Sequence, residues 1–89
     1  FTDLDTTPSL AMGNDFVASN TGATNITQFD NMKRGESYRI RFTNSNTTLV
    51  DGVNLICPGS ANLNPGDTDI YTIYTPDGTT AYVSAGSNN

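Results

Sequence analysis

The sequence predicts an all-β domain, and three observations support this expectation. Thr and Asn, with 14 and 11 copies in 89 residues, suit strands and turns better than helices. Turn signals rich in Gly, Pro, Asn and Asp recur about every ten residues. Several short segments alternate between apolar and polar residues, whereas no window shows helical spacing. We expect a small antiparallel β-sandwich or barrel-like meander of six to seven short strands.

The N-terminal part of the chain is expected to be extended. Pro8 and Gly13 punctuate residues 1–13, and the residues before a proline favour extended backbone. We therefore expect residues 1–13 to be a lead-in, followed by a single β domain over residues 14–89. The first strand of that domain is expected at 15–19, before an Asn-Thr-Gly turn.

The clearest strand pattern lies at 37–43 (SYRIRFT), after a less regular candidate at 24–29 (TNITQF). Apolar and polar residues alternate strictly in the later segment, so Tyr38, Ile40 and Phe42 should face the core. This pattern is typical of an antiparallel sheet with one face packed on the core and the other exposed to solvent.

Three further strand candidates fill the second half of the chain. Residues 47–56 are interrupted by an Asp-Gly pair, which is a hairpin or bulge signal. Residues 69–75 (DIYTIYT) and 79–85 (TTAYVSA) flank a Pro-Asp-Gly turn. We expect these two segments to form a hairpin.

Charge and composition exclude several functions. Four basic residues against nine acidic ones give a net charge of −5, which argues against binding nucleic acid or an anionic membrane. The chain has no His and one cysteine, so it lacks the ligands for a zinc site and an imidazole to activate a nucleophile. Cys57 is expected to be a small core residue, and the paired carboxylates of Asp67 and Asp69 to lie in a turn. We therefore expect that the chain is not an enzyme, that it binds no cofactor or metal, and that no segment of it inserts in a membrane.

A chain this short, with few large apolar side chains and no internal disulfide, has a thin margin of stability. Association with identical copies is the expected source of further stability. Arg39 and Arg41 share one face of their strand, and Arg is enriched at protein interfaces. The expected inter-chain contact residues are Phe16, Ile26, Phe29, Arg39, Arg41 and Leu63.

Tyrosines near the C-terminal hairpin suggest an alternative function. Exposed Tyr rings with short polar groups can bind sugars, because rings stack on the sugar and polar groups bond hydroxyls. Tyr71, Tyr74, Tyr82 and Asp77 are the candidate sugar-contact residues. The competing interpretation places at least two of the four tyrosines in the core or at an interface.

A series of short motifs runs through residues 7–82 in a fixed order. They are TPSL at 7–10, GN at 13–14, NTGATNITQF at 20–29, NTTL at 46–49, GDT at 66–68 and DGTTAY at 77–82. This series resembles a small C-terminal module of bacteriophage tailspikes and tail fibres, although the family's Trp after the last DGT is absent here.

The resemblance implies a homotrimeric β module that follows a larger body and carries no catalytic residues. It implies a role in trimerisation and host attachment, with the virion tail appendage as its place and the bacterial host cytoplasm as its site of assembly. The partners implied are two identical chains. The alternative is a carbohydrate-binding module that contacts a bacterial surface polysaccharide.

Overall fold

A computed structural model describes residues 6–84, and nearly all of their regular structure is β-strand. The all-β class predicted from the sequence is confirmed. The elements are β1 (Asp15–Ala18), β2 (Thr24–Ile26), β3 (Ser37–Phe42), β4 (Thr47–Leu49), β5 (Leu55–Ile56), the 3₁₀ turn η1 (Pro58–Ser60), β6 (Ile70–Tyr74) and β7 (Ala81–Ser84).

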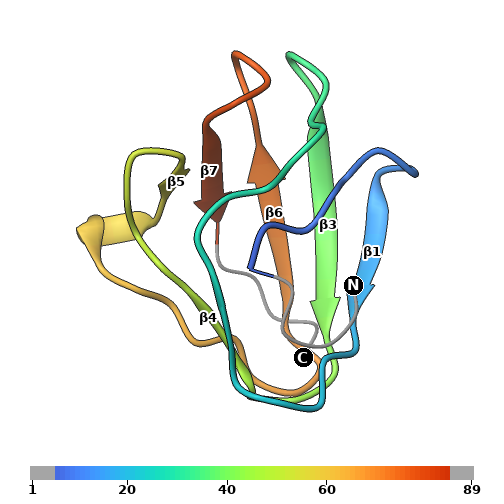
Figure 1. Cartoon of the computed structure of the whole chain (residues 1–89), viewed down its shortest axis with the longest axis vertical. Helices are drawn as coiled ribbons and strands as arrows, with labels where there is room; N and C mark the ends of the chain where they lie inside the picture. The colour runs from blue at the N-terminus through green and yellow to red at the C-terminus, as the bar shows by residue number, and fades with distance from the viewer. Residues whose placement is uncertain (1–5, 85–89) are drawn as a thin grey trace.

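Five of the strands form one sheet in the order β1-β3-β6-β7-β5, and they stand side by side in Figure 1. The sheet is mixed rather than antiparallel. The pairs β3–β6 and β6–β7 are antiparallel, whereas β1–β3 and β5–β7 are parallel. Between β1 and β3 the chain leaves this sheet to form β2. It then returns to the sheet, and β3 runs in the same direction as β1. The predicted hairpin of the last two strands is present as β6 and β7.

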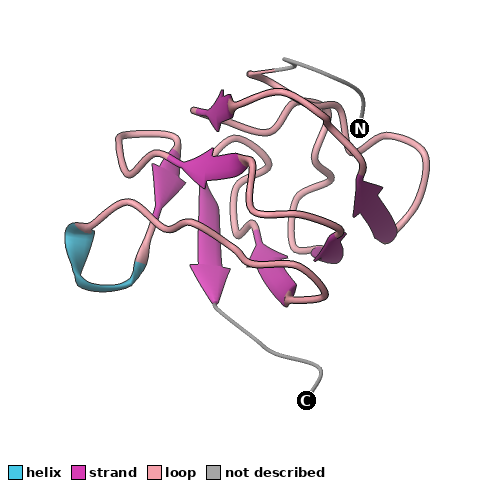
Figure 2. Cartoon of the chain, turned by 90° about the horizontal axis from the view of Figure 1, so that it is seen from below, coloured by secondary structure: helices cyan, strands magenta, loops and turns pink. Residues whose placement is uncertain are grey.

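The remaining strands, β2 and β4, pair in parallel and form a small second sheet. Figure 2 shows the strands end-on, and the burial pattern along them shows that one face of the five-stranded sheet is covered. Strand β3 shows the consequence for its side chains: Tyr38, Ile40 and Phe42 are buried, and the alternating residues are exposed. The inward face predicted for this strand is therefore correct.

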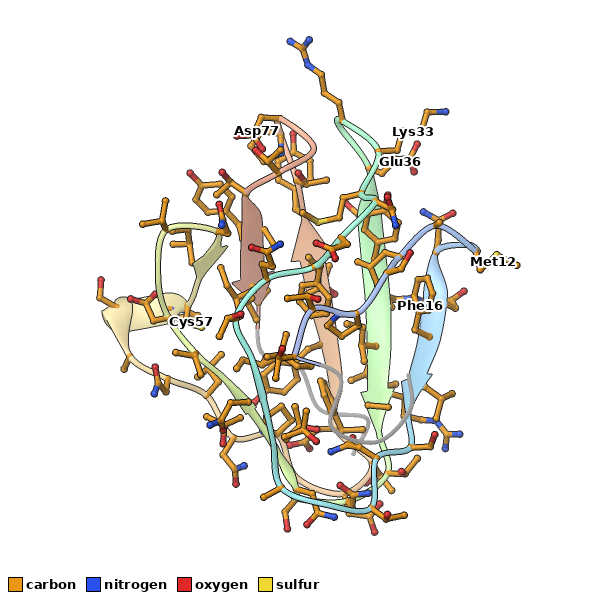
Figure 3. The ribbon with its side chains drawn as sticks, in the orientation of Figure 1. Met12, Phe16, Lys33, Glu36, Cys57 and Asp77 are labelled. Carbon is orange, nitrogen blue, oxygen red and sulfur yellow. The ribbon has the colours of Figure 1, made fainter. Side chains whose placement is uncertain are left out.

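Residues 6–13 belong to the domain rather than preceding it as a lead-in. The Leu10 amide donates a hydrogen bond to the Asp30 carbonyl at 2.8 Å, and the Asp30 amide donates to the Pro8 carbonyl at 2.8 Å. Leu10 is only 1% exposed, whereas Met12 projects from the edge of the fold (Figure 3) and is 91% exposed. The expectation failed because a single apolar residue in a polar segment gives no periodic signal. Residues 1–5 of that segment lie outside the described part of the chain.

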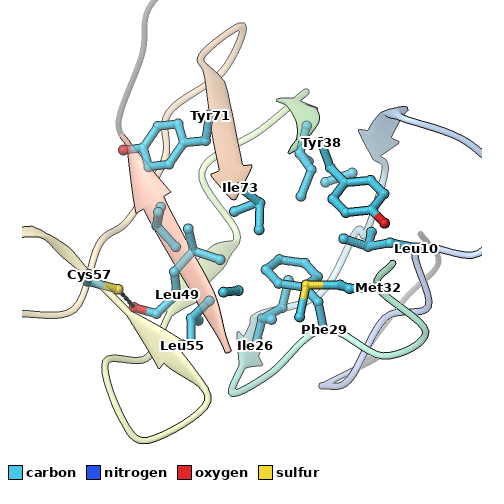
Figure 4. Close-up of a cluster of buried hydrophobic side chains, with 14 of the residues drawn as sticks. Leu10, Ile26, Phe29, Met32, Tyr38, Leu49, Leu55, Cys57, Tyr71 and Ile73 are labelled. Carbon is cyan, nitrogen blue, oxygen red and sulfur yellow. Dashed lines mark hydrogen bonds between the residues drawn. The ribbon is translucent and has the colours of Figure 1, made fainter. Parts of the chain in front are cut away.

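The core lies between the two layers, and all parts of the described chain contribute to it (Figure 4). The ring of Tyr71 meets that of Phe42 edge-on, with centroids 5.5 Å apart. Cys57 is buried as predicted, and its thiol donates to the Leu49 carbonyl at 3.7 Å. The core side chains labelled in Figure 4 are Leu10, Ile26, Phe29, Met32, Tyr38, Leu49, Leu55, Cys57, Tyr71 and Ile73.

A cluster of amide and hydroxyl groups joins the two segments that lead into β2 and β4. The buried Asn20 side chain donates to the Gly22 carbonyl and to Thr24 Oγ1, both at 3.2 Å, and accepts a hydrogen bond from Thr47 Oγ1 at 3.0 Å. The Asn44 side chain donates to the Asn20 carbonyl at 2.6 Å. Part of the Asn and Thr content thus supplies backbone partners where the chain turns between layers.

Candidate functional site: the open face of the sheet

The five-stranded sheet leaves the face turned away from β2 and β4 largely exposed. No segment of residues 6–84 packs over it in the end-on view (Figure 2). We call it the open face. Strand pairing arranges its side chains in three rows, which are Val17–Arg41–Ile70, Asp15–Arg39–Thr72–Ser84 and Ser37–Tyr74–Tyr82–Ile56.

The central row carries an ion pair. Arg39 Nε lies 2.9 Å from Asp15 Oδ1, and both side chains are about two-thirds exposed, at 65% and 69%. Such an exposed pair contributes at most about 1 kcal/mol to stability. Arg41, in the next row, forms no ion pair with any residue of the described chain. A shallow hollow of about 260 Å³ lies here, lined by Asp15, Phe16, Val17, Arg39, Arg41 and Ile70.

Two of the three candidate tyrosines lie on the open face. Tyr74 and Tyr82 are direct cross-strand partners, and they are 45% and 47% exposed. Tyr71 is buried in the core, where desolvation raises the pKa of its hydroxyl, with the Asp69 charge adding to the effect. The prediction that Tyr71 contacts sugar is therefore wrong, because it alternates with Tyr74 across the strand.

The fourth candidate sugar contact, Asp77, is engaged in its own turn. Its Oδ1 accepts hydrogen bonds from the backbone amides of Thr80 at 2.7 Å and Thr79 at 2.9 Å, and its Oδ2 accepts one from the Thr80 hydroxyl at 3.0 Å. These donors favour the charged carboxylate and lower its pKa to about 2. Asp77 therefore shapes the β6–β7 turn, at one end of the sheet (Figure 3).

The expected inter-chain residues fall into two groups. Ile26 and Phe29 are 1% and 2% exposed in the core of the single chain, so that prediction is corrected for both: they have almost no surface to offer a neighbour. Phe16 is half-buried against Tyr38, with ring centroids 6.4 Å apart. Leu63 is partly buried and forms an isolated antiparallel backbone pair with Leu49. Arg39 and Arg41 are exposed on the open face.

A second, polar hollow shares no lining residue with the first, and sequence reasoning missed it. It measures about 270 Å³ and is lined by Gln28, Phe29, Asp30, Asn31, Asn54, Gly78 and Thr79. Asn54 Nδ2 donates to Gln28 Oε1 at 3.1 Å, and Gln28 Nε2 donates to Asp30 Oδ1 at 2.8 Å. We call it the amide groove. Its residues are scattered in sequence, so only the topology brings them together.

Other findings bear on the class of protein. Within residues 6–84 no three His, Cys, Asp or Glu side chains lie close enough to hold a metal ion. The same residues contain no helix with the length and apolarity needed to cross a bilayer. No family model, curated protein or solved structure matches the chain.

Proposed function

We propose that this chain is a self-association module that forms a homotrimer, and that the open face of each copy contacts a different surface of the next. The observation that carries this proposal is the one-sided cover of the sheet. One face is buried by β2, β4 and the N-terminal segment, while the other presents Ile70, Tyr74 and Tyr82 to solvent. Aromatic residues and Arg are enriched at protein interfaces.

Charge distribution supports identical copies as the occupants and indicates a head-to-tail arrangement. The open face holds Arg39, Arg41 and Asp15, so it carries a net positive charge. The other described residues hold two cations, Lys33 and Arg34, against six carboxylates. The positive face of one copy is thus complementary to the acidic remainder of another. Contacts between unlike surfaces form a closed ring when the rotation between neighbouring copies allows it, and we propose that the ring here has three members.

The sequence pattern that resembles the C-terminal module of bacteriophage tailspikes and tail fibres agrees with this proposal. In that setting the trimer would hold three copies of a larger body together in the virion tail appendage. Its contribution to host attachment would be to present three identical surfaces to the bacterium.

Sedimentation velocity of the 89-residue chain tests the association. We expect a species with three times the 9.5 kDa chain mass at micromolar concentration. A monomer throughout the micromolar range would overturn the proposal. A dimer would also overturn the proposal, because the ring needs three copies to close.

Two pairs of variants locate the contact. Arg41→Glu, on the open face, should weaken association by at least about tenfold, as expected for a charge removed from a complementary interface. Arg34→Glu changes the net charge equally in an exposed loop and should leave it within about twofold. In the same way Tyr82→Lys should dissociate the trimer and Val53→Lys, at a loop position 87% exposed, should not. Equal effects within both pairs would place the contact elsewhere.

A further inference from the structure

We propose that the amide groove is a binding site for a neutral sugar ring. The groove shares no residue with the open face, so its lining is distinct from the surface on which the trimer proposal rests. Three segments far apart in sequence form its walls: residues 28–31, the loop position 54, and the β6–β7 turn at 78–79.

The hydrogen-bonding groups of the groove suit vicinal hydroxyls. In the chain Asn54→Gln28→Asp30, each side chain uses only part of its capacity. Beyond these two bonds, the unused groups are an amide N–H and the carbonyl oxygen of Asn54, an N–H of Gln28 and Oδ2 of Asp30. The Thr79 hydroxyl, also in the lining, can donate and accept. Donors and acceptors therefore alternate, and a sugar hydroxyl, which is both, matches such a set.

Hydrogen bonds within the chain hold several of the lining residues of the groove. Its three side chains hold one another in place, and the Asn31 side chain donates to Ser9 Oγ at 2.9 Å. The Thr79 wall is held by the Asp77 carboxylate, which accepts the Thr79 amide hydrogen bond at 2.9 Å. Asp77 thereby acts as a positioning residue for the site. Such preorganisation reduces the entropy that binding would otherwise cost.

Gly78 allows the β6–β7 turn, which forms the Thr79 side of the groove, to pack closely on a neighbouring segment. Its φ is +88°, and a Cβ at this position would lie 3.4 Å from the Met32 carbonyl oxygen. The turn can therefore pack tightly on the chain that leads from the groove to β3. A residue with a side chain would be strained here and would push the turn away.

Size and charge restrict the ligand. The hollow of about 270 Å³ is slightly below the range of roughly 300–1,000 Å³ typical of drug-sized ligands, so one ring is the appropriate size. The only ionised side chain in its lining is Asp30, and the whole chain is acidic. Phosphates, nucleotides and acidic sugars would be repelled. Neutral hexoses and N-acetylhexosamines are therefore the candidate ligands of the groove.

Chemical-shift titration of the isotope-labelled chain tests the site. The probes are glucose, galactose and N-acetylglucosamine, with glucuronate as the anionic comparison. We expect at least one neutral sugar to shift the backbone amides of residues 28–31, 54 and 78–79, with a dissociation constant on the order of 1 mM. We expect glucuronate to produce weaker shifts or none.

Matched variants separate binding from folding. Asn54→Ala should weaken binding by about tenfold through the loss of its hydrogen bonds. The exposed Asn25→Ala, on β2, should bind as the parent chain does. Thr79→Val removes only the hydroxyl, keeps the backbone bond to Asp77, and should weaken binding with an unchanged fold. The absence of shifts from every neutral sugar at about 100 mM would overturn the proposal. So would shifts confined to Tyr74 and Tyr82, which would place the sugar on the open face.

Discussion

The carboxylate of Asp77 accepts two hydrogen bonds from Thr80, one from its backbone amide at 2.7 Å and one from its hydroxyl at 3.0 Å. With the Thr79 amide, they make the ionised carboxylate the organising group of the β6–β7 turn. Because this turn also forms one wall of the amide groove, the protonation of one exposed acid is linked to the shape of both.

The first prediction concerns pH. The pKa of Asp77 is about 2 in the folded chain, below its ordinary value of 3.8. The ionised form therefore stabilises the fold above pH 3.8, and this contribution is lost as the pH falls toward 2. Asp77→Asn should have a lower Tm than the parent chain at pH 6, and the difference should vanish near pH 2. Thermal scans by circular dichroism measure it, and a difference independent of pH would contradict the prediction.

A direct NMR titration measures the pKa of the same Asp77 carboxyl group. Carboxyl carbon NMR of Asp77 should show a midpoint near pH 2 in the folded chain. Thr80→Val removes the hydroxyl donor and retains the amide donor, so the midpoint should rise only part of the way toward 3.8. A midpoint at 3.8 in the parent chain would show that the turn is not held by this carboxylate.

The second prediction tests whether residues 6–13 are part of the domain. Leu10→Ala should lower the free energy of unfolding by about 2–5 kcal/mol, because it removes a fully buried side chain. Met12→Ala is the matched control two positions later, and its effect should stay within about 0.5 kcal/mol because the side chain is exposed. Urea unfolding measures both. If both variants changed the free energy of unfolding equally little, residues 6–13 would be a lead-in that does not pack in the domain.

The third prediction concerns the buried Asn20. Its side chain makes three hydrogen bonds, so Asn20→Ala leaves the Thr47 hydroxyl and the Gly22 carbonyl with fewer partners in a dry site. We expect a loss of about 2–3 kcal/mol. Asn25→Ala, at an exposed position of β2, should cost well under about 1 kcal/mol. If both variants unfold at the same urea concentration, the amide cluster does not stabilise the fold.

The fourth prediction concerns Cys57. Burial raises the pKa of its thiol, and the nearby Asp51 charge raises it further, so little thiolate forms at neutral pH. A thiol reagent such as dithionitrobenzoate should react slowly with the folded chain and rapidly in denaturant. Fast labelling of the native chain at neutral pH would show that the thiol is accessible.

Strand positions were predictable wherever side chains alternate or a turn has distinct chemistry. The pattern at 37–43 gave β3 to within one residue, and the Pro-Asp-Gly turn gave the β6–β7 hairpin. Strand pairing was not predictable in the same way. Strands β2 and β5 have three and two residues, too few to show a period, and their parallel partners lie more than 20 residues away. Pairing at that separation depends on the packing of the layers rather than on local sequence.

The candidate site was predictable in part for a related reason. Strand alternation already separates Tyr71 from Tyr74, and the structure places only Tyr74 and Tyr82 on one exposed face. Ile26 and Phe29 could not be assigned to core or surface, because 24–29 lacks a clean pattern. The amide groove had no local signal, since Gln28 and Asn54 meet only through the arrangement of the two layers.

The position of β7 has a consequence for synthesis of the protein. This strand lies between β6 and β5, although it is the last of the three to leave the ribosome. Until Ala81–Ser84 emerge, β6 and β5 each present an unsatisfied backbone edge, and nascent chains on one messenger would be at risk of pairing with each other. A message truncated before the codons for Ala81–Ser84 would thus yield an aggregation-prone fragment rather than a smaller functional domain.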